Sequence, residues 1–343
     1  MSAVADAIET PRASSGARLV TLLGRFREAG LLVVLAALFL GISLREPRFA
    51  SASNIRQILL SIAIIAIVAI GQTLVVLTRN VDLSVASILG LVAYSVRDVL
   101  ASRPDTPVVV AVLLGILIGA ALGAANGLLI TFGRVPAIVA TLGTLYIFRG
   151  ITFAIGGGEM LTARGVPSGF KQLAAGRPWG IPAPILVAAS LGMAAAYLLR
   201  TTRAGRQLYA IGSNPDAARL AGIPADRLVF AAYVICGALC GVGGILWGSR
   251  FGSIDASAAR GLELNVIAAV VLGGVAIFGG SGTIVGALLG AVLLGTIQNA
   301  LTILRLNQFW LQAISGGAIL VAVTIDLLIT RRLQRALLTR RQR

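Results

Sequence analysis

Long apolar runs separated by short polar breaks fill most of this chain and constrain its fold more than any other feature. A helix needs about 20 mostly apolar residues to cross the hydrocarbon core of a bilayer, so these runs are candidate membrane spans. Charged residues make up only 12% of the chain, so lipid must cover much of its surface. The sequence therefore predicts an all-α fold, a polytopic membrane helical bundle of about ten transmembrane helices. The predicted spans lie near residues 29–44, 55–78, 82–101, 108–131, 136–155, 184–199, 228–249, 263–279, 283–304 and 311–329.

Arginine is distributed unevenly and predicts the orientation of these spans. The net charge is +16, and the arginines gather in two basic tails, residues 1–28 and 330–343, and in a polar stretch at 200–227. Cytoplasmic segments of membrane proteins carry an excess of basic residues. Ten spans place all three segments on the cytoplasmic side of a bacterial inner membrane, with anionic lipid rather than nucleic acid as their partner. The transmembrane domain then covers residues 29–329, with 200–227 as a cytoplasmic loop.

The first span is short and follows a basic tail, as in a signal peptide. Arg45, Glu46 and Pro47 come next, without a small-x-small cleavage site, so we predict an uncleaved anchor. Cleavage would instead leave nine spans and place the two termini on opposite sides of the membrane.

The chain lacks the residue types that many enzymes use. It contains no histidine, so no Ser-His, Cys-His or histidine–metal site can form. The lysine Lys171 does not belong to a phosphate-binding G-x-x-x-x-G-K loop. Cys236 and Cys240 lie in an apolar run and are expected to be small buried side chains. We therefore expect a protein that is not an enzyme, binds no metal or cofactor directly, and leaves any ATP hydrolysis to another polypeptide.

Two similar segments suggest that the bundle has two pseudo-repeated halves. Asn126 lies near the end of the glycine-rich fourth span, and Asn299 lies near the end of the ninth. Because each half would contain five spans, the halves would be inverted relative to each other, as in many transporters. Glycines at four-residue spacing further predict close helix packing, at Gly115, Gly119, Gly123 and Gly127 and again at Gly286 and Gly290.

Residues 78–87 introduce charges between two apolar runs. Arg79 and Asp82 must face water, a partner charge or a helix end, because a charge at mid-bilayer costs about 2.5–3.5 kcal/mol or more. One interpretation is a cytoplasmic turn in which Asp82 caps the next helix, ahead of Ser84. The other is a broken helix at a transport path.

A second break, at Gly279, Gly280 and Gly282, divides an apolar stretch at 266–294. Glycine permits sharp turns, and such backbone is tolerated at membrane depth only when it is buried in protein or lines a cavity. The break is either a tight turn between antiparallel helices or a discontinuous helix at a transport path. The nearly spanning length of both flanks favours the turn.

The polar stretch at 200–227 specifies a short helix by local chemistry. Asn214 can cap a helix, Pro215 suits its first position, and Gly222 suits a left-handed exit. Asp216 favours the positive end of that helix. A helix of about two turns is marginal alone, so we expect a small alanine face to enter a groove on a partner protein rather than rest on lipid. That face consists of Ala217, Ala218 and Ala221.

Several motifs occur in a recognisable order, at residues 76–85, 133–145, 205–222, 261–269, 271–274 and 279–282. Together they resemble the ribose, xylose and arabinose type of sugar permease over residues 55–326. The resemblance implies a transmembrane permease subunit of an ATP-binding cassette importer that translocates a monosaccharide across the inner membrane. It implies partners of three kinds: a separate ATP-binding subunit that uses ATP and Mg, a second permease subunit in a homo- or heterodimer, and a periplasmic or lipid-anchored sugar-binding protein. Membrane lipid is a further expected partner, because of the basic segments described above.

The resemblance also assigns roles to residues. The ATPase-coupling residues it implies are Gly205, Arg206, Tyr209, Gly212, Asn214, Pro215, Asp216, Ala217, Ala218, Arg219 and Gly222. The residues at the two breaks described above, Asp82, Ser84, Gly279, Gly280 and Gly282, are expected to have conformational or structural roles. Hydroxyl-rich ligands need amide and hydroxyl partners, which points to a substrate path at Asn126, Thr141, Thr144, Asn265 and Gln298, although each of these side chains could instead form a hydrogen bond between packed helices.

Departures from the common family pattern bear on the substrate. Arg79-Asn80 stands where pentose permeases have a glycine pair, and with the residues after it is more similar to the rhamnose and autoinducer branch. Ala86 stands where a glycine is usual. The expected substrate is a rhamnose- or ribose-like monosaccharide. The alternative function is an ion- or proton-coupled secondary transporter that uses Asp82 or Asp326 as its ion site.

Overall fold

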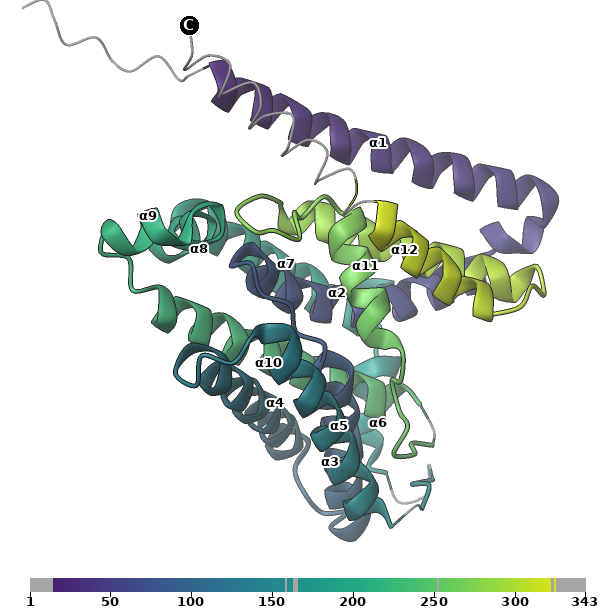
Figure 1. The fold of residues 1–343 in the computed structure, drawn as a ribbon. Coiled ribbons are helices and arrows are strands. Elements are labelled where there is room, and N and C mark those ends of the chain that lie inside the picture. Colours follow the sequence, from purple (N-terminus) through teal and green to yellow (C-terminus); the bar gives the residue numbers. More distant parts are fainter. Residues whose placement is uncertain (1–14, 158, 163–165, 252, 322–323, 325–343) are drawn as a thin grey trace, which may run out of the picture.

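The computed structural model describes residues 15–157, 159–162, 166–251, 253–321 and 324, and these are almost entirely helical (Figure 1). An isolated β-bridge joins Leu161 to Ile254. In chain order the elements are α1 (Ser15–Arg45), η1 (Pro47–Ala50), α2 (Ala52–Leu77), α3 (Val85–Ser102), α4 (Val108–Thr131), α5 (Ala137–Gly156), α6 (Ser168–Ala175), η2 (Pro178–Gly180), α7 (Ala183–Thr201), α8 (Arg203–Ser213), α9 (Pro215–Leu220), α10 (Ala225–Arg250), α11 (Leu262–Leu272) and α12 (Ile284–Ile303), followed by an apolar helix at Phe309–Val321.

The predicted polytopic helical bundle is confirmed. Eight of the described helices are long and apolar enough to cross a membrane, namely α1, α2, α3, α4, α5, α7, α10 and α12. Two shorter apolar helices, α11 and Phe309–Val321, lie at the positions of the other two predicted spans. Apart from residue 324, the part of the last predicted span after Val321, with Asp326, lies outside the described residues. Helix α1 begins at Ser15, so part of the predicted basic tail at 1–28 is helical. The tail at 330–343 lies outside the described residues.

The eighth predicted span, 263–279, is wrong in its extent. Helix α11 has 11 residues and ends at Leu272, so at about 1.5 Å per residue it covers roughly half of a bilayer core. Residues 273–283, called the glycine loop below, follow it as irregular backbone, and Gly274, Gly279 and Gly280 in this loop have φ values of 89°, 79° and 73°. The expected tight turn is therefore a longer loop, because four glycines spread between 274 and 282 adopt conformations that interrupt a helix.

Close packing through glycine is confirmed in two helix pairs. A Cβ atom added to Gly119 of α4 would lie 2.3 Å from the carbonyl oxygen of Gly237 on α10. One added to Gly290 of α12 would lie 2.0 Å from the carbonyl oxygen of Ala269 on α11. Backbones this close leave no room for a side chain, so the glycines set the distance between these helices.

Helix α2 lies at the centre of the bundle. In its most apolar window 83% of the residues are buried, and it packs against α7, α10, α11 and α12. Helix α1 lies at the edge, where only 6% of the corresponding window is buried, as Figure 1 also shows. Helices α4, α5 and α7 expose long apolar faces, which suit lipid or another membrane subunit.

Candidate functional site

Helices α8 and α9 meet at one end of the bundle, where Figure 1 shows them beside the glycine loop. The Thr202 hydroxyl caps α8 by accepting a hydrogen bond from the backbone N–H of Gly205 at 3.0 Å. Asn214 caps α9 by accepting one from Ala217 N–H at 3.0 Å, and Pro215 occupies the first position of that helix. The predicted short helix and its capping chemistry are confirmed.

The outward face of α9 differs from the prediction. Gly222 ends the helix with a φ of +71°, as expected. Ala218, however, is only 3% exposed and packs into the hydrophobic core, so its assignment to a docking face is wrong. The other two alanines of the predicted face, Ala217 and Ala221, are exposed. So are Asp216, Arg219 and Leu220, and Leu220 is 91% exposed. Side chains on a helix are about 100° apart, so Ala218 points into the bundle when its neighbours point outward.

Helix α8 was not predicted as a separate helix, although the sequence carries its signal. Its buried positions recur every three or four residues, at Gly205, Leu208, Ile211 and Gly212. Arg206 lies on the exposed side and donates a hydrogen bond to the carbonyl oxygen of Thr201 at 3.1 Å. Two of the four buried positions are glycines, and Arg206 and Gln207 lie between the first two, so the apolar periodicity is weak.

Three segments that are distant in the sequence meet beside the α8–α9 turn. The backbone N–H of Gly280, in the glycine loop, donates to the carbonyl oxygen of Leu77 at 3.0 Å. Arg79 donates through Nε to the carbonyl oxygen of Gly212, and through Nη2 to that of Ser213 at 2.8 Å. Together these contacts join the end of α2, the end of α8 and the glycine loop.

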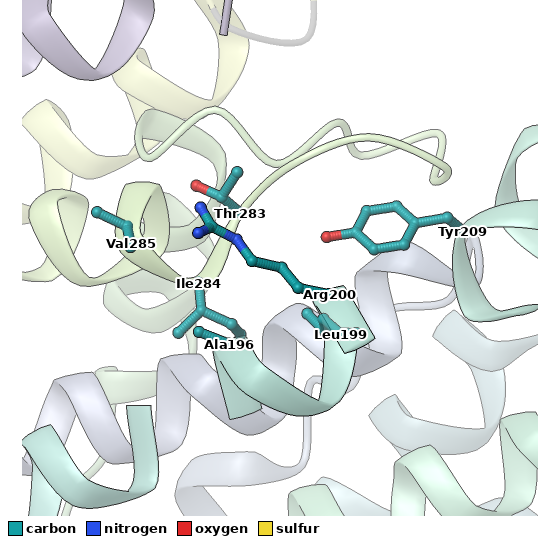
Figure 2. Close-up of a pocket in the computed structure, with 7 residues that line it drawn as sticks. All are labelled: Ala196, Leu199, Arg200, Tyr209, Thr283, Ile284 and Val285. Carbon is teal, nitrogen blue, oxygen red and sulfur yellow. The ribbon is translucent and has the colours of Figure 1, made fainter. Parts of the chain in front are cut away.

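Tyr209 of α8 adds a further contact to the glycine loop. Its hydroxyl donates to the carbonyl oxygen of Gly282 at 2.9 Å. Burial raises the pKa of the Tyr209 phenol above its usual value, against a smaller opposing effect of Arg200, so the phenol remains a neutral donor. The side chains of Tyr209 and Arg200 line a cavity of about 30 Å³ between α7, α8 and the start of α12 (Figure 2). That volume suits about one water molecule, so this cavity is not a sugar site.

The α2–α3 linker (residues 78–84) carries a carboxylate, that of Asp82, in a buried position. Asp82 is fully buried and accepts hydrogen bonds from Ser84, from N–H at 2.8 Å and from Oγ at 2.6 Å. Asn126 of α4 donates to Ser84 Oγ at 2.7 Å. Helix α3 begins at Val85 with Ser84 as its N-cap residue, so the assignment of Asp82 to that cap is wrong by two positions. Asp82 instead stabilises the turn that precedes the helix.

Helices α2, α5 and α10 also hold the linker. The carbonyl oxygen of Val81 accepts a hydrogen bond from Tyr233 of α10 at 3.4 Å. It also lies 3.3 Å from the hydroxyl of Thr141 on α5, which donates at 2.8 Å to the carbonyl oxygen of Ala137 as well. The amide of Gln72 on α2, oriented to satisfy both groups, accepts from Asp82 N–H at 3.1 Å and donates to its carbonyl oxygen at 3.3 Å. The segment is therefore a break between two helices in which Asp82 and Ser84 are buried and Arg79 is exposed.

The structure separates the five residues predicted to line a substrate path. Asn126 and Thr141 contact the α2–α3 linker, and the Thr144 hydroxyl donates to the carbonyl oxygen of Thr141 at 3.3 Å. Asn265 of α11 accepts a hydrogen bond from Ser315 at 3.0 Å. Gln298, on α12, is half-buried. Four of these side chains thus form hydrogen bonds within the bundle.

Two buried arginines at the opposite end of the bundle were not singled out from the sequence. Arg97 of α3 is 2% exposed and donates to the carbonyl oxygen of Thr162 at 2.7 Å. Arg149 of α5 is 9% exposed and donates to the carbonyl oxygens of Ala256 and Ala258 at 3.1 and 2.6 Å. They hold two loops over the ends of α3 and α5. An arginine inside a predicted span is the signal that would have identified both.

Cys236 and Cys240 are both buried and free, as predicted for small apolar side chains. Among the described residues, no group of histidine, cysteine, aspartate or glutamate could hold a metal ion.

A family described as the permease component of the branched-chain amino acid transport system matches residues 54–324. The chain belongs to this permease family. It is 40% identical over 303 residues to the ribose import permease protein RbsC of Bacillus subtilis, covering 88% of this chain and 94% of that protein. It is 35% identical to RbsC of Escherichia coli K12, covering 86% and 92% of the two chains.

The autoinducer 2 import system permease protein LsrC of Salmonella typhi is 37% identical over 317 residues, covering 92% of this chain and 90% of that protein. No solved structure matches the chain at a significant level. Membership in this family makes the chain a multi-pass transport subunit and not an enzyme. ATP use in such an importer belongs to a partner ATPase, and a substrate-binding protein is a further partner.

Proposed function

We propose that this chain is the transmembrane permease subunit of an ATP-binding cassette importer for a monosaccharide, ribose-like or rhamnose-like. The relatives named for ribose and autoinducer 2 import support a small hydroxylated substrate. A second permease subunit, identical or different, would complete the pore. The bacterial inner membrane is the expected location, with both termini in the cytoplasm, because basic residues gather in the tails and around α8 and α9.

The observation that carries this proposal is the exposed, capped helix α9. A short helix with a large apolar side chain facing solvent is suited to a groove on another protein, and Leu220 is almost fully exposed. The chain itself has no phosphate-binding loop, so any ATP hydrolysis that drives transport must come from a partner. We assign α9, with Leu220 as its apolar anchor, as the docking site of the ATP-binding subunit.

The substrate path is proposed to pass beside the α2–α3 linker. Asn126, Thr141 and Thr144 supply amide and hydroxyl groups there, from α4 and α5. All three are buried in this conformation, so substrate would reach them only after the helices separate. Asn265 and Gln298 would contribute from α11 and α12.

The test is uptake in proteoliposomes that contain the permease, its second subunit if different, and the cognate ATP-binding subunit. D-ribose and L-rhamnose, each supplied with the binding protein, serve as radiolabelled probes. We expect uptake that requires ATP and persists when ionophores dissipate ion gradients. Uptake that follows an ion gradient and ignores ATP would contradict the proposal and favour a secondary transporter.

A docking variant makes the assignment of α9 specific. Leu220→Asp places a charge in the proposed apolar contact and is expected to weaken ATPase binding by about tenfold or more. Leu306→Asp is the control. Leu306 is also exposed, to 50%, but it lies in the loop after the C-terminal end of α12, whereas the glycine loop beside α8 and α9 precedes the N-terminal end. Equal retention of the ATPase by both variants would overturn the role of Leu220.

A further inference from the structure

The α8–α9 turn has carbonyl groups that α8 itself does not satisfy. The last carbonyls of a helix lack intrahelical partners, and those of Gly212 and Ser213 stand at the end of α8. Both accept hydrogen bonds from Arg79, which is 133 residues away from Gly212 in the sequence. A guanidinium at this position also faces the negative end of the helix dipole. Arg79 therefore caps α8 from another part of the fold and fixes the turn from which α9 departs.

The backbone at Arg79 shows that this contact is constrained. Its φ of +66° is a left-handed conformation that favours glycine, so an arginine there is held by its surroundings. Those surroundings leave little room for adjustment. A Cβ on Gly279 would lie 2.6 Å from Cγ of Arg79, and one on Gly212 would lie 1.8 Å from the carbonyl oxygen of Leu77. The turn, the end of α2 and the glycine loop are packed backbone to backbone.

The α2–α3 linker connects this contact to the centre of the bundle. Three residues after Arg79, Asp82 and its neighbours are bonded to side chains of α2, α4, α5 and α10. The distance along the chain is too short to absorb a displacement without moving these bonds. In a low-dielectric interior such bonds are costly to break without replacement. A shift of the α8–α9 turn is thus passed to four helices through residues 79–84.

We infer that Arg79 is a positioning residue that couples movement of α9 to the helices around the α2–α3 linker. This inference rests on the proposed function, since α9 is taken as the docking site of the ATP-binding subunit. Arg79 does not contact that subunit or the substrate in this assignment. It determines whether a push on α9 rearranges the bundle or only bends the α8–α9 turn.

Hydrogen–deuterium exchange of the purified permease tests whether Arg79 fixes the α8–α9 turn. Arg79→Gly removes both hydrogen bonds. Glycine adopts the left-handed backbone at this position without strain, so the variant is expected to fold. We expect amide exchange in α9 to become about tenfold faster or more, with α4 and α5 unchanged. Arg227→Gln, which removes an exposed arginine at the same end of the bundle, is the control and is expected to leave exchange unchanged. Unchanged exchange in α9 of Arg79→Gly would overturn the inference.

Proteoliposomes with the cognate ATPase test whether Arg79 couples α9 to transport, by the number of D-ribose or L-rhamnose molecules accumulated per ATP hydrolysed. We expect Arg79→Gly to bind the ATPase normally and hydrolyse ATP, but to lose about fivefold or more in this ratio. Arg79→Lys keeps the charge and one donor nitrogen. Its ratio of sugar accumulated to ATP hydrolysed should lie between those of the wild type and Arg79→Gly. Loss of ATPase binding in proportion to transport, or a normal ratio, would contradict the inference. A wild-type complex without ATP-dependent uptake would instead contradict the proposed function, and the exchange experiment would still decide the role of Arg79.

Discussion

Gly119 on α4 is the position where one added methyl group tests the packing of the bundle most directly. The Cβ of Gly119→Ala would lie 2.3 Å from the carbonyl oxygen of Gly237 and 2.9 Å from Cα of Gly241, both on α10. Ordinary contact begins at 3.4 Å, so the two helices must separate by about 1 Å (3.4 − 2.3). A separation of that size forfeits a quarter to half of the attraction at each contact, and overpacking of this kind costs about 1–3 kcal/mol.

Gly143 on α5 provides the matched control. It is also in the interior of a membrane helix, but a Cβ there would have no atom within 4 Å. Both Gly→Ala changes gain the same helix propensity, about 0.5–1 kcal/mol, so the difference between the variants isolates the steric term. We expect Gly119→Ala to be less stable than Gly143→Ala by about 1–3 kcal/mol in free energy of unfolding.

The assay is reversible unfolding in mixed micelles with increasing sodium dodecyl sulfate, followed by tryptophan fluorescence. Trp247, one of the three tryptophans of the chain, lies on α10 itself and contributes to this signal. If the two variants unfold within about 0.5 kcal/mol of each other, α4 and α10 are not in backbone contact and the packing argument is refuted.

Two further predictions concern the α8–α9 region. Asn214→Ala removes the N-cap of α9 and should cost that helix about 1 kcal/mol, seen as faster amide exchange at Ala217, whereas Asn214→Asp, which can still accept the hydrogen bond, should exchange like the wild type. Tyr209→Phe leaves the carbonyl oxygen of Gly282 without its donor and should lower the free energy of unfolding by about 1 kcal/mol; an unchanged value would show that the hydrogen bond does not stabilise the fold.

Local chemistry was predicted from the sequence with good accuracy. The cap at Asn214, the proline at the first position of α9 and the left-handed exit at Gly222 all follow from the residue types within one nine-residue stretch. Span positions followed in the same way, because the length of an apolar run is a property of the run itself. The exception is α11, which ends at Leu272 because the glycines after it adopt left-handed conformations that an apolar pattern does not reveal.

The candidate site depended on contacts that no local pattern contains. Ala218 and Leu220 are both apolar residues of one short helix, and only the way α9 rests on the bundle decides that the first is buried and the second exposed. Asn126 was proposed to meet a substrate, and the structure shows it bonded to Ser84, 42 residues earlier in the chain. In each case the side chain's neighbours come from other helices.

The sequence by itself determined that this chain is a helical membrane protein with a capped helix in its main basic loop. These properties depend on hydropathy, charge and hydrogen-bonding groups that lie close together along the chain. Only the tertiary structure decided that Arg79 holds the end of α8, that Asp82 is buried, and that the glycine loop closes on α2. Such contacts are fixed by how closely the helix backbones approach, which the packing of all the helices sets together.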